Sequence, residues 1–127
     1  SCPLFVPLVE EGLTKGPITK LIVESYLSHF KNTDVDTLIL GCTHYPILSA
    51  VIKDVVGKNI SLVDSGKAAA EAVMGVLKEN EILSGEPHGE VHSFITDSKQ
   101  SFQTVITKAL TPEFNISIKS INRIDIG

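Results

Sequence analysis

The sequence predicts an α/β fold in which a parallel sheet carries flanking helices. Short runs of apolar, β-favouring residues alternate with longer segments whose apolar residues recur at helical spacing. Single helices separate these strands, which is typical of right-handed parallel crossovers. The length of 127 residues, with 43% hydrophobic and 20% charged residues, suits one ordinary globular domain. Ligands bind outside the carboxyl ends of strands in such sheets. Three polar turns are expected there, at 41–44, 64–66 and 96–98.

Helices and strands alternate along most of the chain. The expected helices cover 17–31, 46–56, 67–80 and 98–110, and the expected strands cover 37–40, 60–63, 91–96 and 115–121. Residues 1–9 are expected to be extended or looped, because Pro3 and Pro7 interrupt any regular run. The strand at 37–40 is mostly apolar, which predicts burial on both of its faces. The last strand alternates apolar and polar residues, as half-exposed or edge strands do.

Residues with known end preferences mark the helix boundaries. Pro17 follows a glycine at the expected start of the first helix, a position that proline favours. Gly57 suits the end of the second helix. Asp64 or Ser65 can cap the start of the third, and Pro112 terminates the fourth.

Composition excludes several classes of function. The formal net charge is -4 and no Lys/Arg cluster is present, which argues against a nucleic-acid or anionic-membrane partner. No apolar run approaches the roughly 20 residues that a membrane span needs, and the first residues do not form a signal peptide. Two cysteines make no disulfide framework, so we expect a reducing, cytoplasmic environment. The apolar start without a Met predicts a fragment of a longer protein.

The turn Gly41-Cys42-Thr43-His44 carries most of the recognisable chemistry. It lies between an apolar strand and Pro46, which opens the next helix. The partial positive charge of a helix start favours a thiolate at Cys42, and its backbone N–H groups can bind a carboxylate or phosphate. The turn therefore offers a nucleophile or base in Cys42, an anion-binding hydroxyl in Thr43 and an acid in His44.

Less specific interpretations of the same residues were weighed. A lone cysteine is more often a small buried apolar residue, but the turn after a strand favours a functional Cys42. The Cys-x-His spacing is not a usual zinc pattern, so no metal is expected. A thiol phosphatase would need a phosphate loop ending in arginine, and Arg123, the only arginine, lies far along the chain. Cys2 is expected to be structural, and the residues alone give Glu10 no role.

Three motifs together resemble the bacterial glutamate racemases. The segment 38–46, which ends in Gly-Cys-Thr-His-Tyr-Pro, is similar to the second cysteine motif of that family. The segment 2–10 resembles the stretch that precedes this motif, and 63–66 resembles the later turn where the chain crosses between lobes. The spacings among the three also fit, and the resemblance extends to about Ser98.

The resemblance implies a cofactor-independent isomerase that interconverts L- and D-glutamate and supplies D-glutamate for peptidoglycan, and hence for cell-wall biogenesis and cell shape. Such racemases have two α/β lobes with the site between them. Residues 1–64 would form most of the second lobe, and 65–127 would return to complete the first. The expected partners are glutamate and the missing N-terminal lobe. Exposed strand edges would also favour association with a second copy.

The resemblance also assigns roles to residues. Two cysteines, one from each lobe, would act on opposite faces of the substrate, with Cys42 facing the α-hydrogen of L-glutamate. Thr43 and His44 would bind substrate, His44 would assist proton transfer, and Glu10 would pair with His44 and favour its charged form. The first catalytic cysteine of the family and its neighbouring motifs are absent, so the chain alone is expected to be inactive.

Two alternatives stay open. One is a related aspartate, hydantoin or arylmalonate-acting member of the superfamily, although the His-Tyr-Pro and Pro-Leu-Val-Glu sequences favour glutamate. The other is a non-catalytic α/β binding module with a structural Cys42. That hypothesis predicts slow alkylation of Cys42 at neutral pH, whereas a catalytic thiol would react readily.

Overall fold

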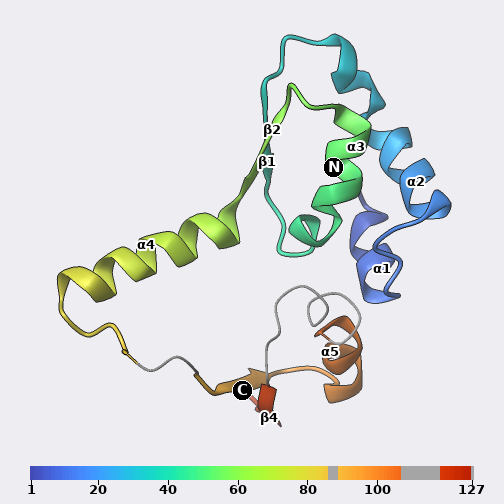
Figure 1. Cartoon of the computed structure of the whole chain (residues 1–127). Coiled ribbons are helices and arrows are strands. Elements are labelled where there is room, and N and C mark those ends of the chain that lie inside the picture. Colours follow the sequence, from blue (N-terminus) through green and yellow to red (C-terminus); the bar gives the residue numbers. More distant parts are fainter. Residues whose placement is uncertain (86–88, 107–117, 127) are drawn as a thin grey trace.

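Parallel strands and flanking helices make up the computed structural model, which describes residues 1–85, 89–106 and 118–126. The predicted α/β class is therefore confirmed. Within the described residues the strands pair in two sheets rather than one. The first sheet joins β1 (Thr37–Leu40) to β2 (Ser61–Asp64), and the second joins β3 (Val91–Ile95) to β4 (Ile118–Arg123). Helix α4 (Ser65–Glu79) leads from one sheet to the other (Figure 1).

The first sheet carries its helices on one face. Helices α2 (Pro17–Leu27) and α3 (Ser49–Val56) pack against each other, and both lie on the same side of β1 and β2 (Figure 1). Apolar side chains from these elements and from α1 (Phe5–Glu10) form one core. Its buried members are Phe5, Val9, Val23, Leu27, Leu40, Leu48, Ile52, Val55, Val56 and Ile60.

Helix α1 contradicts the expected extended start of the chain. Residues 1–9 were predicted to be extended or looped, but Phe5–Glu10 is helical and buries Phe5, Leu8 and Val9. Pro7 is the third residue of this helix. The N–H groups of a first helical turn have no intrahelical acceptor, so proline costs nothing there. Burial of the apolar side chains then favours the helix.

The exposure of β1 is a second difference from the prediction. The strand was expected to be buried on both faces, yet Ile39 is 73% exposed and Val63 on β2 is 39% exposed. Figure 1 shows the reason, since no helix covers the face of the sheet opposite α2 and α3. The apolar pattern is there, but this chain does not supply the cover.

Most expected boundaries hold to within a few residues. Gly57 ends α3 with a φ of 95°, a left-handed conformation that glycine adopts without strain. Asp64 caps α4 by accepting hydrogen bonds from the backbone N–H groups of Gly66 (2.8 Å) and Lys67 (3.3 Å). The two central helices differ in detail, because the first ends in a 3₁₀ turn at Ser28–Asn32 and the second begins with η2, a 3₁₀ turn at Tyr45–Leu48.

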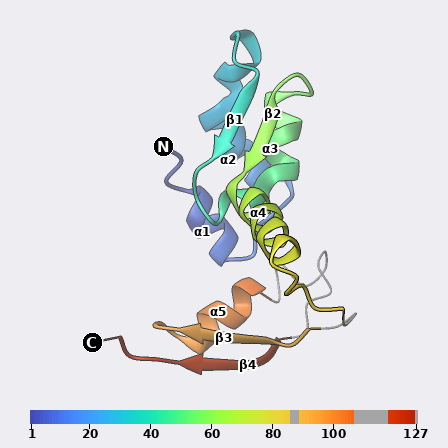
Figure 2. The ribbon, with the colours of Figure 1, turned by 90° about the vertical axis from the view of Figure 1, so that its left-hand side faces the viewer.

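The second sheet belongs to a smaller unit. Helix α5 (Lys99–Val105) follows β3 and packs against α1, and Val105 contacts the core of the first unit. This contact places the carboxyl end of β3 beside α1 (Figure 2). The expected ends of the fourth helix (107–110) and the start of the last strand (115–117) lie outside the described residues. Among those that are described, no helix is long and apolar enough to cross a membrane.

Candidate functional site

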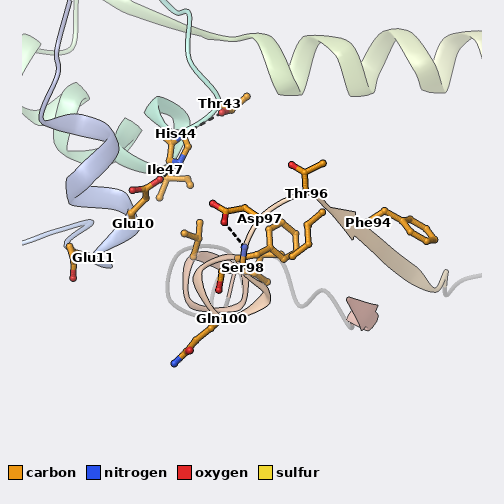
Figure 3. A pocket seen from close by; sticks show the side chains of 14 residues that line it. Glu10, Glu11, Thr43, His44, Ile47, Phe94, Thr96, Asp97, Ser98 and Gln100 are labelled. Carbon is orange, nitrogen blue, oxygen red and sulfur yellow. Dashed lines mark hydrogen bonds and ion pairs between the residues drawn. The ribbon is translucent and has the colours of Figure 1, made fainter. Parts of the chain in front are cut away.

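An open cleft of about 930 Å³ lies where the two units meet. Two of the three predicted polar turns contribute to it, one after β1 and one after β3. Figure 3 shows the two groups of side chains on either side of the opening. The lining residues are Glu10, Glu11, Thr43, His44, Ile47, Phe94, Ile95, Thr96, Asp97, Ser98, Gln100, Phe102, Val105 and Ile106.

The turn after β1 forms the first wall. The strand ends at Leu40, which is buried, and Leu48 anchors the far side of the turn in the same core. Between them, Tyr45 N–H donates to the carbonyl of Cys42 at 3.2 Å, and Ile47 N–H donates to that of His44 at 3.1 Å. These bonds curl the backbone into η2 and leave Thr43 and His44 at the cleft.

Both ring nitrogens of His44 have a partner. Nδ1 lies 3.3 Å from the hydroxyl of Thr43, and Nε2 lies 3.8 Å from Oε1 of Glu10, the last residue of α1. The predicted Glu10–His44 pair is therefore present, with side chains 57% and 28% exposed respectively. The two contacts orient the ring, and the carboxylate favours its charged form.

Aromatic packing holds α1 against this turn. The ring of Phe5 meets those of Tyr26 and Tyr45 edge to face, with centroids 5.6 Å and 5.1 Å away. The Tyr45 hydroxyl donates to the carbonyl of Cys2 at 3.4 Å, and burial raises the pKa of Tyr45. Since Phe5 and Glu10 share α1, this cluster fixes how close Glu10 comes to His44.

The two cysteines occupy different surroundings. Both are half-buried free thiols. Cys2 packs against the core, and desolvation raises the pKa of its thiol, as befits a structural residue. Cys42 precedes Thr43 but is not among the residues that line the cleft. The structure thus brings Glu10, Thr43 and His44 together and places Cys42 one residue from the edge of the cleft.

The second wall comes from the loop between β3 and α5. Thr96, Asp97, Ser98 and Gln100 face the cleft, and Ser98 N–H donates to Oδ1 of Asp97 at 2.6 Å. The sequence indicated a polar turn at 96–98, but nothing in it singled out Asp97. The available signal was the position of that turn directly after a strand. The third turn, at 64–66, lies at the carboxyl end of β2 and does not line the cleft.

The site does not resemble a metal centre. Within the described residues no group of three or more His, Cys, Asp or Glu side chains could hold a metal ion. Its polar groups are an imidazole, carboxylates, hydroxyls and an amide, all suited to binding a small polar molecule.

Fold and site together define an α/β chain whose polar turns meet at a cleft beside the carboxyl ends of parallel strands. No model of a protein family matches the chain. Curated glutamate racemases do. That of Aquifex aeolicus is 41% identical over 120 residues, which is 94% of this chain and 44% of the relative. That of Persephonella marina is 49% identical over 102 residues, or 80% and 37% of the two chains.

Solved structures give the same result. The glutamate racemase of Thermus thermophilus, in complex with β-chloro-D-alanine, matches with a TM-score of 0.76 and 31% identity, covering 98% of this chain and 46% of that one. The enzyme of Francisella tularensis, in complex with D-glutamate, has a TM-score of 0.76 and 29% identity, covering 98% and 45%. The predicted resemblance to glutamate racemases is confirmed, and the chain spans less than half the length of these relatives.

Proposed function

We propose that this chain is part of a glutamate racemase, which interconverts L- and D-glutamate without a cofactor. The observation that carries the proposal is the Glu10–His44 pair beside Thr43, on the turn that follows Cys42. Relatives named glutamate racemase, of which this chain covers 37% to 44%, support the choice of substrate.

The proposed reaction is a proton transfer at the α-carbon. The Cys42 thiolate takes the α-proton of L-glutamate and becomes a thiol. A second thiol on the opposite face then gives its proton to the same carbon, which leaves D-glutamate and a thiolate. The second cysteine belongs to the part of a racemase that lies outside the matched region. Cys42 has the required position, since its neighbour Thr43 lines the cleft.

His44 supplies the electrostatic part of the mechanism. The α-proton of an amino acid is weakly acidic, so the site has to stabilise negative charge that develops on the substrate. An imidazolium at His44 does this, and it can also exchange a proton with Cys42. Glu10, 3.8 Å from Nε2, keeps that ring charged, and Thr43 binds substrate and orients the ring from the other side.

The proposal includes a division of the chain between two lobes. Residues 1–64 form most of one lobe, and 65–127 complete the other. The separate sheets joined by α4 support this division, and the uncovered Ile39 and Val63 support a missing N-terminal portion as the partner. In the cell, the complete enzyme supplies D-glutamate for peptidoglycan from the cytoplasm.

A chimera tests the proposal. The matched segment of the Aquifex aeolicus racemase is replaced by this chain, and D-glutamate formation is followed by chiral chromatography. The chimera is expected to racemise glutamate in preference to aspartate or hydantoins. Cys42→Ser is expected to abolish activity, and the matched Cys2→Ser to leave it near the parent level. Equal activity in the two variants would sink the role of Cys42.

The chain by itself offers a second measurement. We expect no exchange of the α-proton of L-glutamate in deuterated water, followed by NMR, because only one of the two thiols is present. Fast exchange that Cys42→Ser removes would show that a single thiol suffices, and the two-cysteine mechanism would then have to be abandoned for this chain.

A further inference from the structure

Asp97 stands across the cleft from the Glu10–His44 pair and has no role in the mechanism above. We propose that Asp97 binds the ammonium group of the amino-acid substrate. The proposal rests on the proposed function, since it concerns the same cleft, but it names a binding residue that comes from the other unit of the chain.

The carboxylate of Asp97 is held in place and retains acceptor capacity. It lies in the loop between β3 and α5 and faces the cleft (Figure 3). The backbone N–H of Ser98 donates to Oδ1 at 2.6 Å, which fixes the side chain. An ionised carboxylate has about four lone-pair sites, so this one bond leaves most of them for a ligand.

The neighbours of Asp97 suit an ammonium group. Such a group donates three hydrogen bonds and accepts none. The hydroxyls of Thr96 and Ser98 line the same wall and are acceptors that flank the carboxylate. A charged acceptor with two neutral acceptors beside it provides three partners for one ammonium.

The other wall of the cleft has the opposite character. Glu10 already faces His44 at 3.8 Å, so its charge is partly balanced by the imidazole. His44 and Thr43 present N–H and O–H donors there, which suit a substrate carboxylate. Glu11 also lines the cleft but lies farther from Asp97 than Glu10 does in Figure 3. An α-amino acid that spans the cleft therefore places its ammonium at Asp97 and its carboxylate towards His44.

The test compares two ligands that differ in this one group. Glutarate is the dicarboxylate that remains when the amino group of glutamate is removed. The 127-residue chain is titrated with L-glutamate and with glutarate, and binding is followed by amide chemical shifts. We expect the chain to bind glutamate about tenfold more tightly than glutarate, as one charge-assisted contact allows. Asp97→Asn should bind the two ligands equally.

A control variant separates this effect from general charge. Asp34→Asn removes one exposed carboxylate far from the cleft and should keep the preference for glutamate. The proposal is overturned if the parent chain binds neither ligand or shows no preference, or if Asp97→Asn keeps the preference. It is also overturned if Asp97→Asn weakens glutarate as much as glutamate.

These outcomes can be told apart from failure of the proposed function. Racemase activity is read from the chimera, whereas the ammonium preference is read from binding to the chain alone. A lost preference in Asp97→Asn beside an inactive chimera would retain the binding site and reject the racemase. An active chimera whose KM for glutamate is unchanged by Asp97→Asn would reject the role of Asp97 only.

Discussion

Phe5 is expected to hold the candidate site together, and its truncation to alanine is the sharpest test of the fold. The side chain is 1% exposed and meets two aromatic rings edge to face. Truncation of a buried phenylalanine costs about 3–5 kcal/mol, because the lost transfer free energy adds to that of the cavity. Small domains are stable by about 5–15 kcal/mol, so Phe5→Ala should remove a large part of the total.

Urea unfolding followed by circular dichroism measures this loss. With a slope of about 1–3 kcal/mol per molar urea, Phe5→Ala should move the midpoint down by 1 M or more, or leave the chain unfolded in water. Phe94, on β3, is the matched control because it is 63% exposed. Phe94→Ala should cost less than about 1 kcal/mol. Equal midpoints for the two variants would refute the placement of α1 against η2.

Three further predictions concern charge and exposed surface. In the chimera, Glu10→Gln should lower kcat about tenfold and move the pH profile of activity to lower pH, because His44 then loses the carboxylate 3.8 Å away that favours its charged form; an unmoved profile would contradict this. The Lys20 ammonium holds the pKa of Asp54 below its usual range, while Asp54 raises that of Lys20. Asp54→Asn should therefore lower the urea midpoint at neutral pH, with the difference vanishing in acid as Asp54 protonates and in strong alkali as Lys20 loses its proton. Ile39→Lys should reduce self-association in sedimentation velocity and leave the urea midpoint nearly unchanged, since this side chain is 73% exposed.

Local signals in the sequence predicted most of the elements, and the failures have physical causes. The start of α4 follows from the capping capacity of Asp64, and the end of α3 follows from Gly57. Helix α1 was missed because proline was taken as a break, although its third helical position tolerates proline. The pairing of strands into two sheets depends on contacts between distant segments, which no local pattern encodes.

The candidate site was predicted in part. Motif resemblance singled out Glu10, Thr43 and His44, and the fold brings these residues together at one wall of the cleft. Asp97 could not be singled out, because an aspartate in a polar turn after a strand is common. Its position opposite His44 results from the packing of α5 against α1, which is a tertiary contact.

The exposed strand β1 links the fold to the proposed function. Ile39 is apolar at a position where this chain leaves 73% of the side chain in contact with solvent. An apolar residue in a strand is favoured where the face of the sheet is covered, so the sequence is suited to a larger assembly than the chain forms alone. The cleft leads to the same conclusion, because its first wall carries one thiol and a racemisation of the proposed kind uses two. Both features are explained if a single missing portion covers the sheet and brings the second thiol to the opposite face of the substrate.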